Sequence, residues 1–286
     1  MTPSVRLAIW NIERRLALSP GDAPRSTPGC IITELLLLQA DIIFIPESHN
    51  LPELPKKIRR QFEAVGYTVY ECAYDDPARV KIEPDVATHS MFLTKFPLET
   101  AKKYRYDRHR SLPTICVRID DSSTLTLVGI HLDDRSEAAR RVQAGAIIRQ
   151  YKKSTTPLVL LGDFNAMHKK GIAWLYGSWI IRQASRLIPH TFLRSVVERF
   201  SAMANGGTLR MLMAELGLRD ADPYRHSTVT PKMRGLEFLP SIPLAQIDHI
   251  LISDDIQVDD IEVMDDGGSD HRAVVATIKL DKREKI

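Results

Sequence analysis

Short runs of apolar and β-branched residues recur along the chain between polar segments, and this pattern predicts β-strands. The runs are VRLAIW at 5–10, DIIFIP at 41–46, YTVYECA at 67–73, SMFL at 90–93, TICVRI at 114–119, TLTLVGI at 124–130, PLVLLG at 157–162, IDHILI at 247–252, IQVDDIEV at 256–263 and AVVATIKL at 273–280. Between several of them, the segments 28–40, 51–66 and 136–153 have the apolar spacing of amphipathic helices. Strands alternating with helices predict an α/β fold.

No linker rich in Gly, Ser or Pro divides the chain and no internal repeat is visible, so we expect one domain over 1–286. The exception to the alternating pattern is the segment 168–207, which contains no strand-like run. Its stretches WLYGSWIIRQASRLI and HTFLRSVVERFSAM predict two helices separated at Pro189. We interpret this segment as a helical insertion into the domain.

Composition narrows the class of protein only slightly. The chain has 286 residues, of which 44% are hydrophobic and 26% charged, and its formal net charge is +3. These are ordinary values for a globular protein, and the small positive charge is compatible with a polyanionic substrate. Three widely spaced cysteines form no zinc-binding pattern, and no stretch resembles a signal peptide or a membrane span. We therefore expect a cytoplasmic protein, and we expect it to be a monomer.

Polar side chains that can take part in catalysis follow the predicted strands where each strand ends. They are Asn11 and Glu13, Glu47, His131, Asp163 and Asn165, Asp248, and Asp270 with His271. In α/β proteins the strand ends collect ligand-binding side chains, because several strands converge there on a rigid sheet. We therefore expect these residues to form one site.

The residue types at these strand ends favour a hard divalent cation. Carboxylates with Asn and His, and without cysteine, suit Mg²⁺ or Mn²⁺ better than a thiolate zinc site. Such a cation commonly works with phosphate, and hydrolysis of a phosphoester needs a polarised phosphate, an oriented water and stabilisation of the leaving oxygen. The residues that fit these tasks are Glu47 on the metal, Asn11, Asn165 and His131 on the phosphate oxygens, Asp163 on the water, and His271 held by Asp248.

Six short motifs, in order, resemble the endonuclease/exonuclease/phosphatase superfamily. They are WNIE at 10–13, PES at 46–48, GIHLDD at 129–134, GDFN at 162–165, QIDHI at 246–250 and SDH at 269–271. Each one alone is weak, but together they span residues 10 to 271. The resemblance implies a four-layer α/β sandwich, with two mixed β-sheets packed face to face and helices outside.

Carried over motif by motif, the resemblance also implies roles for individual residues. It implies Glu47 as the principal ligand of Mg²⁺ (or Mn²⁺), with Asn11 and either Glu13 or Asp270 completing the metal site. It implies Asp163 as the water-orienting group or general base, Asn165 and His131 as phosphate-binding groups, and Asp248 with His271 as a terminal dyad. We interpret His249 as structural, because the equivalent family position commonly holds an aromatic residue.

The resemblance implies a metal-dependent phosphodiesterase, and we expect a nuclease acting on DNA or a related phosphoester. Arg108 and Arg110 lie in the best basic cluster and are predicted substrate contacts. Two enzyme alternatives stay open, a phosphomonoesterase and a lipid phosphodiesterase of the inositol-phosphate or sphingomyelin type. A non-catalytic binding module with the same fold is the alternative of another class. The insertion either packs on the domain, caps the substrate, or contacts a membrane surface peripherally through 172–204.

Overall fold

The computed structural model describes residues 3–13, 15–16, 28–49, 53–72, 89–106, 110–168, 183, 191–230, 244–267 and 269–281, with the backbone alone at 28–30 and 191–196. Two six-stranded β-sheets form its centre. Sheet 1 contains, in spatial order, β11 (Ile256–Val263), β12 (Val274–Leu280), β1 (Ser4–Ile9), β2 (Ile42–His49), β4 (His89–Thr94) and β3 (Thr68–Cys72). Sheet 2 contains β5 (Leu98–Arg105), β6 (Ser111–Arg118), β7 (Thr124–His131), β8 (Leu158–Asp163), β10 (Asp248–Ser253) and β9 (Leu218–Asp220).

Both sheets are mixed. In sheet 1, β1 pairs in parallel with β2 and antiparallel with β12. In sheet 2, β7 pairs in parallel with β8, and β8 pairs antiparallel with β10. The two parallel connections bring the carboxyl-terminal ends of neighbouring strands to the same edge of each sheet, which is where the polar motifs follow.

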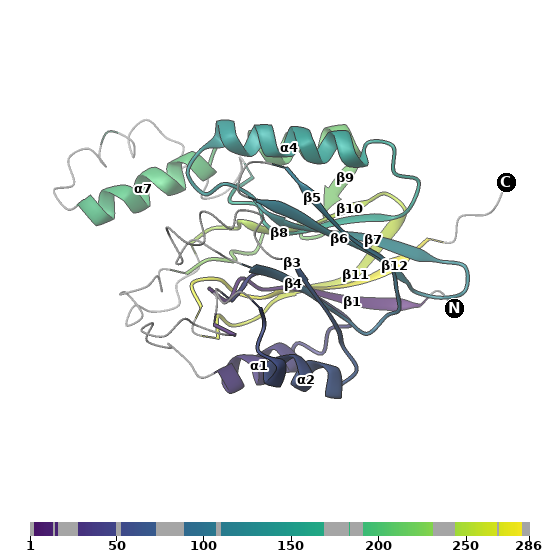
Figure 1. Ribbon diagram of the computed structural model, residues 1–286. Helices are drawn as coiled ribbons and strands as arrows, with labels where there is room; N and C mark the ends of the chain where they lie inside the picture. Colours follow the sequence, from purple (N-terminus) through teal and green to yellow (C-terminus); the bar gives the residue numbers. More distant parts are fainter. Residues whose placement is uncertain are drawn as a thin grey trace.

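Helices cover the outer face of each sheet (Figure 1). On sheet 1 these are α1 (Pro28–Leu37) and α2 (Lys56–Ala64), and on sheet 2 they are α4 (Glu137–Tyr151) and α8 (Gly207–Leu216). The layers run from helix through sheet and sheet to helix. The expected four-layer α/β sandwich is therefore confirmed.

Alternating side chains of each strand form the separate hydrophobic cores that hold these layers together. In β1, Leu7 and Ile9 face the core between the sheets, whereas Ala8 packs toward α1 and α2. In β8, Leu161 faces the inter-sheet core, and Leu160 packs beneath α4 and α8. Strands buried on both faces read as continuous apolar runs, which explains sequences such as VRLAIW and PLVLLG.

The two sheets approach closely at Gly129, near the carboxyl-terminal end of β7. A Cβ atom on Gly129 would lie 2.3 Å from the Phe44 ring of the facing sheet. Phe44 in turn packs on Phe92, with ring centroids 4.7 Å apart. The glycine therefore makes room for an aromatic pair that fills the inter-sheet core.

Only part of the expected helical insertion lies within the described residues. Its second predicted helix is present as α7 (Thr191–Met203), which lies beside the amino-terminal end of α4 (Figure 1). Arg140, a buried residue of α4, donates from Nη2 to the Ala202 carbonyl of α7 at 2.5 Å and from Nη1 to the Asp133 carbonyl at 2.9 Å. Residues 169–182 and 184–190, which include the first predicted helix apart from Gln183 and much of the proposed membrane-contacting segment, lie outside the described residues.

Among the described helices, none is both long enough and apolar enough to cross a bilayer.

Candidate active site

The predicted site residues extend the inner faces of the two sheets beyond the inter-sheet core. In β8, Val159 and Leu161 line that core, and Asp163 is the next residue on the same face. Strand side chains alternate between faces with a period of two, so the next inward position becomes polar where the core ends. The same alternation applies to Asn11 after β1, His131 at the end of β7 and Asp248 at the start of β10.

Glu47 reaches the site because β2 is irregular. The strand advances four residues from Ile45 to His49 while its partner β4 advances two, so β2 carries a bulge. In a regular strand Glu47 would share the outer face with Ile45. In the bulged strand its Oε1 lies 3.5 Å from Nε2 of His131 in the opposite sheet. The bulge therefore redirects the carboxylate into the site, as bulges near active sites commonly do.

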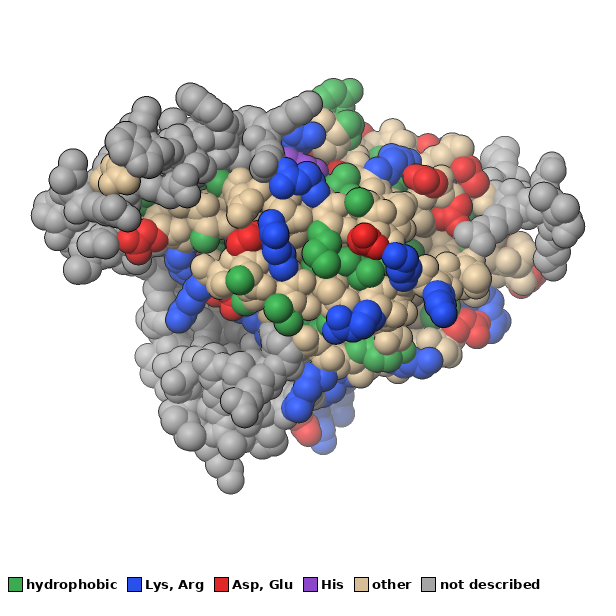
Figure 2. Space-filling view, turned by 90° about the horizontal axis from the view of Figure 1, so that it is seen from above, with side chains coloured by type: hydrophobic (Ala, Val, Ile, Leu, Met, Phe, Trp, Pro, Cys, Tyr) green, Lys and Arg blue, Asp and Glu red, His purple; other side chains and the backbone are tan. Residues whose placement is uncertain are grey.

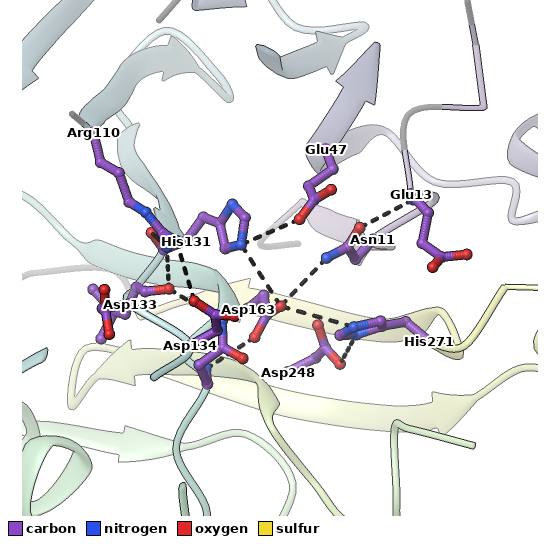
Figure 3. A network of polar contacts seen from close by, with 12 residues as sticks. Asn11, Glu13, Glu47, Arg110, His131, Asp133, Asp134, Asp163, Asp248 and His271 are labelled. Atoms are coloured by element: carbon purple, nitrogen blue, oxygen red, sulfur yellow. Dashed lines mark hydrogen bonds and ion pairs between the residues drawn. The ribbon is translucent and has the colours of Figure 1, made fainter. Parts of the chain in front are cut away.

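Asp163 lies at the centre of the cluster (Figure 3). Asn11 Nδ2 donates to its Oδ2 at 3.3 Å, and the same oxygen lies 4.0 Å from His131 Nε2 and 3.8 Å from His271 Nε2. Burial and the nearby Asp248 carboxylate together raise the pKa of Asp163 to about 7. This carboxyl group therefore changes its charge near neutral pH, as a general base requires.

Asp248 and His271 form the expected dyad. His271 Nδ1 lies 2.8 Å from Asp248 Oδ2, and both side chains are buried. Burial lowers the pKa of the imidazole, but Asp248 and Asp270 outweigh it and raise the pKa of His271 well above its ordinary value. The hydroxyl of Thr228 accepts from the Asp248 backbone N–H at 3.1 Å. Sequence reasoning missed Thr228, whose only signal was the β-branched TVT stretch at 228–230.

The GDFN motif forms a tight turn that fixes Asp163 and Asn165. Gly162 has φ +152°, and a Cβ atom there would lie 1.9 Å from the Ile130 carbonyl oxygen. Asn165 has φ +47°, its backbone N–H donates to Asp163 Oδ1 at 2.9 Å, and its Nδ2 donates to the Leu132 carbonyl at 3.1 Å. The glycine and the asparagine therefore occupy backbone conformations that other residues disfavour.

Two residues missed by the sequence reasoning join the first motif to the last. Trp10 Nε1 donates to the His271 carbonyl at 3.0 Å, and Ser269 Oγ donates to the Asn11 carbonyl at 2.8 Å. Ser269 Oγ also accepts from the His271 backbone N–H at 3.2 Å. Their signal was present in the sequence, since both lie inside the quoted WNIE and SDH motifs.

Arg110 supports the loop that follows His131. Its Nη1 donates to the His131 carbonyl at 2.9 Å and to the Leu132 carbonyl, and its Nη2 lies 3.9 Å from Asp134 Oδ1. The guanidinium is thus engaged with the backbone of this loop, and its predicted contact with substrate stays a prediction. Arg108, the other predicted substrate contact, lies outside the described residues.

The four predicted metal ligands differ in how far they enter the site. Asn11 contacts Asp163, and Glu47 faces His131, as described above. Glu13 follows the turn after β1 at φ +48°, and its backbone N–H donates to Asn11 Oδ1 at 3.1 Å. The carboxylate of Glu13 points away from Asp163 (Figure 3), whereas Asp270 Oδ1 lies 3.8 Å from Nε2 of His271. Their ligand roles stay predictions.

The donor set of the site fits a divalent cation. The ligand atoms of Asp163, Asp248 and His271 lie within 4.8 Å of one another. Among the described residues, the buried Asp248 Oδ1 and Asp270 Oδ1 have no hydrogen-bond partner. Since a buried carboxylate oxygen without a partner is costly, a cation or an ordered water bound here would stabilise it. The raised pKa of His271 favours its protonated form, in which Nε2 can donate a hydrogen bond.

Comparison with protein families gives a match over most of the chain. A model described as "Endonuclease/Exonuclease/phosphatase family" matches residues 8–271. That range includes all six motifs and every residue of the cluster. No protein with curated function matches the sequence.

Solved structures of the same fold cover nearly the whole chain at low identity. An endonuclease/exonuclease/phosphatase protein from Beutenbergia cavernae superposes with a TM-score of 0.65 at 19% identity, covering 97% of this chain and 72% of that one. The human Nocturnin catalytic domain with bound sulfate gives 0.64 at 14% identity, with 98% and 96% covered. A 3' phosphatase from Neisseria bound to a product DNA hairpin gives 0.61 at 17% identity, with 97% and 99% covered. At these identities the likeness establishes the fold.

Proposed function

Because the chain belongs to the endonuclease/exonuclease/phosphatase family, we propose that it is a divalent-metal-dependent phosphodiesterase that acts as a nuclease. Members of this family hydrolyse phosphoester bonds and generally depend on divalent metals. The observation that carries the proposal is the convergence on Asp163 of Asn11, His131 and His271, which come from different strands or their ends.

In the proposed reaction, Asp163 accepts the proton of the attacking water. Its pKa of about 7 lets the carboxylate form near neutral pH and still bind a proton readily. Asn11 Nδ2, 3.3 Å from Oδ2, orients this carboxylate. The side chain is buried at the end of a strand, so the carboxylate is held in one position relative to the other residues of the site.

His271 and His131 are proposed to bind the phosphate. Asp248 fixes the His271 tautomer and favours its cationic form, leaving Nε2 as a donor toward a phosphate oxygen or the leaving oxygen. His131 approaches from the opposite side of Asp163, as Figure 3 shows. Asn165 carries a second amide hydrogen besides the one donated to Leu132, and we assign it to the same phosphate.

We propose that Glu47 holds the metal, with Asn11 and Asp270 completing the site. A divalent cation bound there supplies charge neutralisation and polarisation of the phosphate. Coordination by these residues would leave the hydrogen bond between Asp248 and His271 in place, which argues for them over coordination by the dyad itself.

A nucleic acid substrate is favoured by the net charge of +3 and by the Neisseria structure, which is described as a 3' phosphatase with product DNA. On the face that carries α4, basic side chains are interspersed with acidic and apolar ones (Figure 2). This face therefore does not single out a substrate surface. We assign the substrate to the end of the sandwich that carries Asp163 and His271, because these residues are proposed to act on its phosphate. A mannosyl-6-phosphatase from Bacteroides thetaiotaomicron has the same fold, so a phosphomonoester is the competing substrate.

One assay tests this proposal. The protein is incubated with plasmid DNA, abasic and 5′-tyrosyl oligonucleotides, sphingomyelin, phosphoinositides and a sugar phosphate, in Mg²⁺, Mn²⁺ or a chelator. We expect cleavage of a DNA substrate that depends on metal and is lost in His271→Ala. His226→Ala, a change at a half-exposed histidine that pairs with Asp222 and not with Asp163 or Asp248, should behave as wild type. Activity that survives chelation excludes the metal mechanism. Hydrolysis of the sugar phosphate alone replaces the nuclease assignment with a phosphomonoesterase, and hydrolysis of no substrate favours a binding module.

A further inference from the structure

A second cluster of histidine and aspartate lies on the other face of sheet 2, away from the catalytic residues. His249 directly follows Asp248 in β10, so its side chain projects to the outer face of the sheet. Its ring packs edge-on against Phe164, which belongs to the core beneath α4 and α8. His168 and Asp220 meet it there, with the ligand atoms of all three within 4.8 Å of one another.

Asp220 is the shared partner of both histidines. Its Oδ2 lies 2.9 Å from His168 Nε2 and 2.8 Å from His249 Nδ1. Its other oxygen, Oδ1, accepts from the Asp222 backbone N–H at 3.0 Å. The carboxylate is therefore held by the backbone on one side and presents the other oxygen to two imidazole nitrogens.

The hydrogen bonding of His249 fixes which of its nitrogens is available. Nε2 lies 2.9 Å from the Ala166 carbonyl, and because a carbonyl only accepts, Nε2 carries the hydrogen. Nδ1 faces the Asp220 carboxylate, which also only accepts, so Nδ1 carries a hydrogen too, and Asp220 outweighs burial and raises the pKa of His249. A metal ion entering the cluster would take the place of this Nδ1 hydrogen and leave the Nε2 hydrogen on the Ala166 carbonyl. A histidine whose outer nitrogen donates to a backbone carbonyl, with the inner nitrogen facing other donors, is the usual arrangement of a metal ligand.

We propose that His168, Asp220 and His249 form a structural binding site for a transition-metal dication such as Zn²⁺. Metal bonds of about 2.0–2.2 Å to nitrogen and oxygen place the donors of a tetrahedral ion about 3.3–3.6 Å apart. Asp220 Oδ2 lies 2.9 Å from His168 Nε2 and 2.8 Å from His249 Nδ1, so small outward movements suffice to admit the ion. Two imidazoles with one carboxylate select Zn²⁺ and its neighbours over Mg²⁺, which prefers oxygen. His168 is 12% exposed, so the site is within reach of solvent and leaves a position for water.

Occupancy of this site would act on the active site through the backbone. His168 lies three residues beyond Asn165 on the segment leaving β8, and His249 is the neighbour of Asp248 in β10. A metal between them ties together the ends of the two strands that carry Asp163 and Asp248. The proposal concerns binding and is independent of the proposed nuclease activity.

The test is a calorimetric titration with Zn²⁺, and with Co²⁺ as a spectroscopic probe, in excess Mg²⁺ and in the Glu47→Gln background so that the catalytic site is disfavoured for these ions. We expect one equivalent to bind, with the visible absorption of nitrogen-coordinated cobalt. A Zn²⁺ concentration 100 times the Kd should raise the Tm by roughly 5 °C.

The variants His168→Gln and Asp220→Asn should each weaken binding at least 100-fold. His226→Ala is the matched control, because His226 Nδ1 also pairs with a buried aspartate, Asp222, at 3.1 Å, and it should bind as wild type. His168→Gln decides the question if Asp220→Asn does not fold, since His168 lies nearer the surface. Failure of the parent protein to bind an equivalent, or equal binding by His168→Gln, overturns the proposal.

Discussion

Replacing Gly162 with alanine should damage both the fold and the active site. The added Cβ would lie 1.9 Å from the Ile130 carbonyl oxygen and 2.8 Å from the Ile130 backbone nitrogen, and these backbone atoms belong to the neighbouring strand β7. A flexible side chain could move aside, but a paired strand cannot. Overpacking typically costs about 1–3 kcal/mol, and a φ reserved for glycine costs about the same again.

The sum predicts a loss of about 4 kcal/mol in the free energy of unfolding, or roughly 8–16 °C in Tm. The strands must also separate where His131 lies opposite Asp163, so turnover by the folded fraction should fall about 100-fold. Urea denaturation followed by fluorescence measures the first effect, and DNA cleavage at saturating metal measures the second.

Gly145 provides a matched control for this substitution. It lies within α4, and a Cβ there would meet only the Arg149 Nη1 atom, at an ordinary 3.6 Å. Gly145→Ala should stabilise the protein by up to about 1 kcal/mol, because alanine favours a helix, and leave turnover unchanged. If Gly162→Ala unfolds within about 0.5 kcal/mol of wild type, the steric reasoning is wrong.

Three further predictions concern charge at the active site. In the wild type, turnover should decrease as the pH falls below about 7, the pKa of Asp163, and Asp163→Asn should lower turnover by several orders of magnitude at every pH; retained turnover would exclude Asp163 as the base. In metal-free protein, the raised pKa of Asp163 makes the free energy of unfolding fall as the pH rises from about 4 to 7, because the folded state binds the proton more tightly than the unfolded state. Asp163→Asn should therefore be more stable than the wild type at pH 8, as measured by urea denaturation. Asp248→Asn should lower the pKa of His271, followed by NMR, and decrease kcat about 10²–10⁴-fold, and an unchanged His271 titration would contradict the dyad.

The linear sequence predicted most strands because each is buried on two faces and reads as an apolar run. The sequence did not predict β5 and β9, and the physical reasons differ. β5 is an edge strand whose central residues, in LETAKKYR, are exposed, so it carries no buried face to detect. β9 has three residues, too few to show any period.

The candidate site was predictable to the extent that its residues lie at strand ends within short motifs. Asp163 and Asn11 follow directly from the alternation of buried positions in β8 and β1. Glu47 required the motif, because regular alternation directs it outward and only the bulge in β2 brings it in. Thr228 was missed because its contact with Asp248 joins two positions 20 residues apart that no periodic pattern connects.

The pairing of the first strand with the last has a consequence for how the protein is made. β12 lies between β1 and β11, and its preceding turn supplies His271, whose carbonyl accepts from Trp10 across 261 positions of sequence. Contacts between such distant positions form late, because the intervening chain must close a long loop first. During synthesis the amino-terminal strand β1 can therefore pair with β12 only after residues 274–280 have been made, so sheet 1 is completed late.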